Sequence, residues 1–135
     1  MIMFKYDYRI LHIMGSRRIP SIVKRADRVA KSYITKSNCR VSMYAEIARG
    51  GNVIARGYNK KTFQGSIHAE VDAISKLLRQ KRGADGATIT VIRYLKNDSF
   101  GMSKPCPKCK KAIIKAGIKR INYFDYDGNF HSERL

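Results

Sequence analysis

The sequence predicts an α/β protein in which helices cover a sheet whose later strands run parallel. Three observations lead to this prediction. Segments whose apolar residues have helical spacing alternate with short β-rich segments, and turn residues separate them. The resulting order is helix, hairpin, helix, strand, helix, strand, which is typical of a helix-covered sheet. The length of 135 residues allows one core, so we expect an N-terminal arm at residues 1–20 and one domain at residues 21–135.

A helix and a hairpin are expected first. From Ser21, a good N-cap residue, apolar side chains recur at helical spacing over residues 21–34. The two runs at residues 41–48 and 53–58 predict a β-hairpin, because the glycine pair between them can adopt positive φ. We expect a loop over residues 59–67.

The second half of the chain predicts two helices and two strands. Residues 68–81 have apolar side chains at helical period, and the β-rich run at residues 87–94 suits a central strand. Proline is tolerated in a first helical turn, so a helix begins at residues 105–107 and ends at Gly117. The remaining segments are a polar loop at residues 96–104, a strand at residues 118–124, and a loop and tail at residues 125–135.

The charge balance indicates a polyanionic partner. The chain has 28 Lys and Arg residues against 10 Asp and Glu residues, which gives a formal net charge of +18. Such a charge attracts polyanions through a long-range field, and nucleic acid is the partner that fits it. A generally basic proteome gives the same composition, so the charge alone leaves nucleic-acid binding open.

The N-terminal residues and the cysteines indicate an intracellular protein. Residues 1–9 alternate apolar and charged side chains where a secretory signal needs an unbroken apolar run. No apolar run approaches the roughly 18 residues of a membrane span. Three cysteines, two of them separated by two residues, fit metal or redox chemistry in a reducing compartment better than a disulfide framework. We therefore expect a cytoplasmic location, with Cys39 as a buried thiol.

Two short motifs supply candidate metal ligands at two predicted helix starts, which is where sites lie in folds of this kind. His-Ala-Glu at residues 68–70 opens one helix, and Pro-Cys-Pro-Lys-Cys at residues 105–109 opens the next. Residues three apart share a helix face, and a helix N-terminus favours thiolates, so Cys106 and Cys109 can bind one ion. With His68 they make three ligands. The fourth tetrahedral position then stays open for water, as in a catalytic zinc site.

Two other interpretations of these residues exist. A closed structural zinc site would take Cys39, His12 or His131 as a fourth ligand. A redox dithiol would leave the His-Ala-Glu motif unexplained. Each motif alone is a weak signal, but together, in this order and at two helix starts, they favour a catalytic zinc.

Glu70 stands two residues beyond the histidine and is expected to move protons. A carboxylate beside the water can take its proton and deliver it to a ring nitrogen and then to the leaving ammonia. Zinc lowers the pKa of its water to roughly 7, so a nucleophile is available at neutral pH. The pairing of H-x-E with P-C-x-x-C is the signature of zinc deaminases that attack carbon 4 of cytosine or carbon 6 of adenine.

The chain resembles the cytidine and deoxycytidylate deaminase superfamily over about residues 21–127. The resemblance is strongest at residues 68–74 (HAEVDAI) and 105–118 (PCPKCKKAIIKAGI), which look like deoxycytidylate deaminases in particular. It implies a three-layer α/β/α sandwich with a mixed sheet. It also implies that the C-terminal helix and strand are reduced here, or that the N-terminal arm replaces them.

The resemblance further implies which residues form the site. In this chain it assigns zinc binding to His68, Cys106 and Cys109, proton transfer to Glu70, and substrate contact to Asn59 and Ala69. The amide of Asn59 can donate to a sugar hydroxyl or ring oxygen, although a plain turn residue is the alternative. Residues 60–64 (KKTFQ) stand where deoxycytidylate deaminases usually have glycine and a proline-containing loop near the substrate phosphate. This departure counts against a free monophosphate as the substrate.

Two further features favour a polymer substrate. Residues 103–106 and 120–127 are similar to segments of nucleic-acid-editing cytidine deaminases, whose aromatic loop touches a flanking nucleotide. By this likeness Tyr126 stacks on a neighbouring base, although a partly buried aromatic is the alternative. A lysine stripe on one helical face can follow phosphates or be a solvated face. The stripe consists of Lys104, Lys108, Lys111 and Lys115.

The leading hypothesis is therefore a zinc-dependent hydrolytic deaminase. It converts cytosine to uracil in a cytidine nucleotide or in single-stranded nucleic acid, and the charge favours the polymer. The alternatives are a deaminase of free dCMP or CMP, an adenosine deaminase acting on tRNA, and a non-catalytic zinc module that binds nucleic acid. Assembly into a homo-oligomer is compatible with each.

Overall fold

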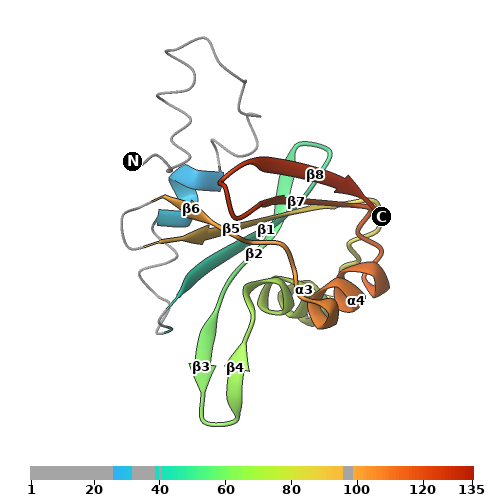
Figure 1. Ribbon diagram of the computed structural model, residues 1–135. Helices are drawn as coiled ribbons and strands as arrows, with labels where there is room; N and C mark the ends of the chain where they lie inside the picture. Colours follow the sequence, from blue (N-terminus) through green and yellow to red (C-terminus); the bar gives the residue numbers. More distant parts are fainter. Residues whose placement is uncertain (1–25, 32–38, 40, 96–98) are drawn as a thin grey trace.

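The computed structural model describes residues 26–31, 39, 41–95 and 99–135 (Figure 1). The predicted arm at residues 1–20 lies outside these ranges, as does most of the first predicted helix. Residues 26–31 of that helix are helical, as expected. The labelled elements are β1 (Ser42–Arg49), β2 (Asn52–Tyr58), β3 (Lys60–Thr62), β4 (Gly65–Ile67), α3 (Ala69–Arg79), β5 (Thr88–Tyr94), β6 (Phe100–Gly101), α4 (Pro107–Lys115), β7 (Arg120–Phe124) and β8 (Phe130–Arg134).

The main sheet is mixed. Its strand order is β2-β1-β5-β7-β8, and β6 pairs with β5 off this path. Strands β5 and β7 are parallel, and the other pairs are antiparallel. The predicted hairpin is present as β1 and β2, and its turn glycines have φ of 59° at Gly50 and 80° at Gly51. The prediction of a mixed sheet with parallel later strands is confirmed.

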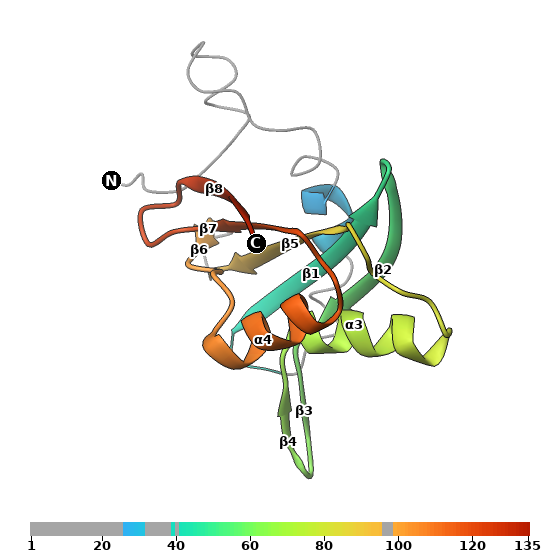
Figure 2. The ribbon, with the colours of Figure 1, turned by 90° about the vertical axis from the view of Figure 1, so that its right-hand side faces the viewer.

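Helices lie on both faces of this sheet, so the fold has three layers. Helices α3 and α4 cover one face, and helical residues 26–31 lie on the other (Figures 1 and 2). Alternate residues of each strand serve the two faces, as the pleat requires. Along β5, Ile89 and Val91 join the cluster under α3 and α4, whereas Ile92 and Tyr94 join the cluster that contains Ala26.

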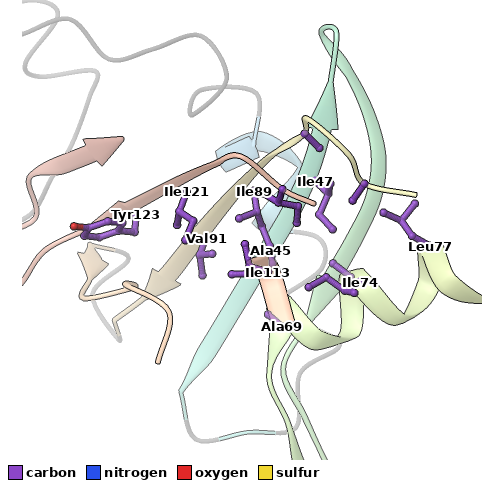
Figure 3. Close-up of a cluster of buried hydrophobic side chains, with 14 residues drawn as sticks. Ala45, Ile47, Ala69, Ile74, Leu77, Ile89, Val91, Ile113, Ile121 and Tyr123 are labelled. Atoms are coloured by element: carbon purple, nitrogen blue, oxygen red, sulfur yellow. The ribbon is translucent and has the colours of Figure 1, made fainter. Parts of the chain in front are cut away.

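The larger core cluster holds the two helices on the sheet. It includes Ile74 and Leu77 from α3 and Ile113 from α4, packed on strand residues such as Ile47 and Ile121 (Figure 3). Since both helices start at the same edge of the sheet, this packing brings their first turns together. The three-layer α/β/α prediction is confirmed.

Residues 59–67 were expected to form a loop, and this expectation is wrong. They form a second hairpin, β3–β4, in which Lys60 pairs with Ile67 and Thr62 with Gly65. The Thr62 hydroxyl donates to the Gly65 carbonyl at 2.8 Å, and Gly65 has a φ of 122°, which favours glycine. The segment lacks an alternating apolar face, so period-2 patterning gave no sign of these strands.

The expectation of a loop and tail over residues 125–135 is also wrong, because residues 130–134 form strand β8. This strand pairs with all of β7, from Phe124 opposite Phe130 to Arg120 opposite Arg134. A five-residue turn makes the pairing local, since Asp125 Oδ1 accepts from the backbone N–H groups of Asp127 and Asn129, both at 2.9 Å. The C-terminal strand is therefore present, and no helix follows β7 among the described residues.

The predicted polar loop at residues 96–104 contains a short strand among its described residues 99–104. Phe100 and Gly101 form the short strand β6, and Phe100 is buried against Phe124, with ring centres 4.5 Å apart. Over the whole described part of the chain, no helix is long and apolar enough to cross a membrane.

Candidate metal centre

The candidate ligands sit at the first turns of α3 and α4. His68 is the N-cap of α3 and Cys106 is the N-cap of α4, both with extended backbone, and Cys109 lies in the first turn of α4. Pro107 occupies the first position of α4, where a missing N–H costs nothing. Neither N-cap side chain makes a capping hydrogen bond to the backbone of its helix, so the imidazole and the thiol stay available to a ligand.

The structure brings these three side chains together. His68 Nδ1 lies 3.2 Å from Cys109 Sγ and 3.8 Å from Cys106 Sγ. All three ligand atoms are within 4.8 Å of one another. A tetrahedral zinc with ordinary bond lengths separates its nitrogen and sulfur ligands by about 3.5–3.8 Å. The distance to Cys106 lies in this range and the distance to Cys109 is slightly shorter, so a small shift of the side chains would admit such an ion. Neither Cys39 nor His131 belongs to this group, and His12 lies outside the described residues.

Glu70 lies beside the ligands as a buried carboxyl group. Only 3% of the residue is exposed, and its Oε1 has no hydrogen-bond partner among the described residues. Burial raises the pKa of this carboxyl, while its own backbone N–H, the charge of His68 and the Cys109 thiol act in the opposite direction. A buried carboxylate oxygen without a partner is costly unless a bound group completes it.

The surroundings of the Cys109 thiol also favour a bound cation. Burial raises its pKa well above the ordinary range, and the negative charge of Glu70 and the neighbouring Cys106 raise it further. A bound divalent cation reverses these effects, because it stabilises a thiolate directly. The chemistry of these residues therefore fits a zinc ion. Two sulfurs and one imidazole can bind it, and the buried carboxyl beside them can bond to a group held by the ion.

Ser103 fixes the loop that leads into Cys106, and sequence reasoning gave it no role of its own. Its hydroxyl donates to the carbonyl of Val91 in β5 at 2.7 Å and accepts from the N–H of Phe124 in β7 at 2.9 Å. The backbone N–H of Ser103 also donates to the Phe124 carbonyl. These bonds tie the loop to the middle of β5 and to the last residue of β7, three residues before the cysteine.

Asp72 fixes the other ligand-bearing helix and was also missed. Its buried carboxylate accepts from the N–H of Tyr58 at 3.2 Å and pairs with Lys60 at 3.1 Å and with Lys76 at 3.3 Å. These contacts join α3 to β2 and β3 two residues after Glu70. The signal in the sequence was the spacing of Asp72 and Lys76, which are four residues apart and therefore share a helix face.

The predicted substrate contacts lie in different surroundings. Asn59 uses its side-chain amide to hold the start of β1, accepting from the N–H of Met43 at 2.9 Å and donating to the carbonyl of Val41. Ala69 is fully buried in the first turn of α3. Tyr126 is 85% exposed in the turn between β7 and β8. Substrate contact by each of these residues stays a prediction.

The predicted lysine stripe is exposed. Lys104 precedes α4, with its Nζ 5.6 Å from the centre of the Tyr123 ring. The three helical members, Lys108, Lys111 and Lys115, are all solvent-facing. Phosphate contact by this stripe stays a prediction as well.

A mixed sheet between helix layers, with one imidazole and two thiols at two helix starts and a carboxyl beside them, defines the class of zinc-binding nucleobase deaminases. The chain belongs to the cytidine and deoxycytidylate deaminase family, whose zinc-binding region matches residues 17–125. The predictions of family, fold and zinc as the cofactor are thereby confirmed.

Relatives and solved structures agree with this assignment. The chain is 33% identical to ComE operon protein 2 of Bacillus subtilis (strain 168), over 74% of this chain and 58% of that protein. It is 37% identical to the deoxycytidylate deaminase of Enterobacteria phage T2, over 49% of this chain and 30% of that protein. The chain thus spans less than two thirds of the length of either relative.

The dCMP deaminase of cyanophage S-TIM5, solved in complex with dCMP and dUMP, has the same fold. It superposes with a TM-score of 0.62 at 24% identity, over 82% of this chain and 85% of that one.

Proposed function

We propose that this chain hydrolyses the exocyclic amine of cytosine in a cytidine nucleotide, giving uracil and ammonia. The observation that carries the proposal is the unpaired, buried Oε1 of Glu70 beside the His68, Cys106 and Cys109 cluster. The family match and the shared fold support this proposal.

The reaction needs one proton carrier and an activated water. Water adds to carbon 4 as a C–O bond forms, and the bond from carbon 4 to the amine nitrogen then breaks. Zinc held by the three ligands supplies Lewis acidity toward that water. Glu70 takes one proton of the water on its unpaired oxygen and delivers it to ring nitrogen 3. It then takes the second proton from the hydroxyl now on carbon 4 and delivers it to the departing amine, so that ammonia leaves and a carbonyl forms. Burial keeps this proton from exchanging with bulk solvent during the transfer.

Substitution of Glu70 tests the assignment. Glu70→Gln and Glu70→Ala should lower turnover by at least about 100-fold, because one general acid–base group contributes about 10²–10⁴. Zinc content and the melting temperature should stay near those of the original chain, since Glu70 lies outside the ligand set. Glu133→Gln is the matched control, because Glu133 is a partly exposed carboxylate that pairs with Lys110 and is not part of the ligand cluster. Undiminished turnover in both Glu70 variants would refute the proposed role.

The substrate that the charge favours is cytosine in single-stranded nucleic acid. The net charge of +18 and the exposed lysines before and along α4 support this choice, as does the exposed Tyr126 beyond β7. Proteins bind single strands with cationic side chains that contact the nucleic-acid backbone and with aromatic side chains on which bases stack. Uracil formation should be compared on dCMP, CMP, cytidine and single-stranded oligonucleotides. Polymer turnover at subsaturating substrate should fall steeply between about 50 and 200 mM salt.

A free deoxycytidine monophosphate is the second candidate substrate. The phage T2 relative is named deoxycytidylate deaminase, and the similar cyanophage structure contains dCMP and dUMP. Turnover confined to free nucleotides would establish this candidate and reject the polymer.

A further inference from the structure

We infer that the β3–β4 hairpin is a second contact point for a single-stranded nucleic acid, with Phe63 stacking on a base of the strand outside the metal centre. The inference rests on the polymer substrate proposed above and deepens it.

Phe63 lies in the turn between β3 and β4. This hairpin projects from the body of the molecule (Figures 1 and 2). Phe63 is 98% exposed, and residues 61–66 around it are all exposed. An isolated two-stranded hairpin is marginal in water, and an aromatic ring with no burial adds nothing to the core. A single exposed apolar residue is ordinary on a protein surface. A projecting hairpin that leads into a metal ligand and holds an exposed aromatic ring at its tip suggests that the ring contacts a ligand.

The turn that carries Phe63 is internally fixed. Thr62 Oγ1 donates to the Gly65 carbonyl at 2.8 Å and accepts from the N–H of Gln64 at 3.2 Å. Gly65 takes the positive φ that closes the turn. The Phe63 ring is therefore held by a turn whose conformation is fixed by internal hydrogen bonds.

The root of the hairpin is fixed to the metal-bearing helix. Lys60 pairs with the buried Asp72 of α3, and its Nζ lies 4.3 Å from the centre of the Tyr58 ring. At the other strand, Ile67 leads directly into His68. Phe63 precedes His68 by five residues, which corresponds to at most about 17 Å along an extended strand. The tip thus has a defined position relative to the metal centre.

The charge of the chain selects the partner. Lys61 is exposed beside Phe63, and the segment that leads into Cys106 exposes Lys104. Both segments that deliver metal ligands therefore present cations. At a net charge of +18, contact between two copies is opposed by repulsion, whereas an anionic strand is attracted. Proteins that bind single strands without sequence preference place cations along the path of the nucleic-acid backbone and offer aromatic rings on which bases stack.

A tryptophan reporter tests the stacking directly, because the chain has no tryptophan. In Phe63→Trp, binding of a single-stranded oligonucleotide should quench the indole fluorescence, since the ring stacks on a base. The control is Leu78→Trp, at a 69% exposed position in α3, where the same oligonucleotide should leave the fluorescence unchanged. Unquenched fluorescence of the Phe63→Trp variant in a saturated complex would overturn the inference.

The affinity of Phe63→Ala provides the second measurement. Its dissociation constant for the oligonucleotide should rise about 5- to 150-fold, and its ratio of oligonucleotide to dCMP turnover should fall, with zinc content unchanged. An unchanged dissociation constant would reject the hairpin and leave the polymer substrate standing. If the original chain neither binds nor deaminates oligonucleotides, the polymer and the hairpin contact fall together, while dCMP turnover would preserve the deaminase proposal. Quenching of the Phe63→Trp variant by protein concentration alone would instead assign the hairpin to contact between copies.

Discussion

Gly57 of β2 lies directly against the backbone of Ala69, the first residue of α3. A Cβ atom added at Gly57 would stand 2.4 Å from the Ala69 carbonyl oxygen and 2.5 Å from the N–H nitrogen of Ala73. Backbone atoms cannot move aside as a flexible side chain does, so the helix approaches the strand only because this residue is glycine. The position of His68 and Glu70, on either side of Ala69, depends on this approach.

Gly57→Ala should therefore displace the start of α3. We expect a loss of about 1–3 kcal/mol in the free energy of unfolding, as for other overpacked positions, together with weaker zinc binding and lower turnover. Gly83→Ala is the matched control, because a Cβ there makes only an ordinary contact at 3.6 Å. Denaturant unfolding and zinc content of both variants measure the effect. Equal stability of the two variants would show that β2 and α3 can separate without consequence.

The metal centre was predictable because its signals are local. His68 and Cys106 each lie at a helix start, and the spacing of Cys106 and Cys109 places two sulfurs at one helix end. Alternation along β5 and the glycine pair of the first hairpin are equally local, and they predicted the sheet. Gly57 within a strand was a usable signal of close backbone approach that the sequence reasoning passed over.

Some of the missed features lack an alternating pattern in the sequence, and others depend on partners distant in the chain. Strand β8 exists because β7 offers a free edge, and its polar sequence shows no core-facing alternation. Ser103 bonds to Val91 and Phe124, which no pattern around residue 103 reveals. The amide of Asn59 is engaged by Val41 and Met43 through the tertiary structure, so its turn-like surroundings in the sequence gave no hint of this role.

Zinc should stabilise the folded chain through the three-ligand cluster. A ligand at 100 times its dissociation constant adds about 2.7 kcal/mol, which corresponds to a rise of about 10 °C in melting temperature for a chain of this size. Cys109→Ser should abolish most of this rise, because it removes the buried sulfur 3.2 Å from His68 Nδ1. Cys39→Ser should retain it, since Cys39 is not part of the cluster. Thermal melts with zinc and with a chelator decide the matter, and an equal zinc response in both variants would exclude the assigned ligand.

Loss of the Ser103 hydroxyl should weaken the second half of the site. Ser103→Ala leaves the buried N–H of Phe124 without its side-chain acceptor, which costs about 1–3 kcal/mol. We also expect weaker zinc binding in competition with a chelator, because the loop before Cys106 loses its side-chain bonds to β5 and β7, although the backbone bond from Ser103 to Phe124 stays. Ser132→Ala, which removes an exposed bond from Arg120, should change neither quantity appreciably. A Ser103→Ala protein with full stability and zinc affinity would show that other contacts hold this loop.

The stability of the turn that contains Tyr126 should depend on pH, because the Asp125 carboxylate holds this turn. His131 Nε2 lies 2.7 Å from Asp125 Oδ2, and the His131 ring stacks on Tyr123. Partial burial acts to raise the pKa of Asp125, but the bonds from His131 and from the N–H groups of Asn129 and Asp127 outweigh it and lower the pKa. A lowered folded-state pKa means stabilisation that is present above about pH 3.9, the unfolded value, and is lost as pH falls through the folded value.

Asp125→Asn tests this, since asparagine keeps an acceptor for the turn but loses the charge. The original chain should exceed the variant in unfolding free energy by at most about 1 kcal/mol near neutral pH, because the pair is partly exposed. The difference should shrink as the pH falls below about 4. Asp127→Asn, in the same turn, should show no such trend. Urea unfolding of all three proteins between pH 3 and pH 7 measures it, and a difference that is constant or grows toward low pH would mean that the Asp125 carboxylate does not stabilise this turn by its charge.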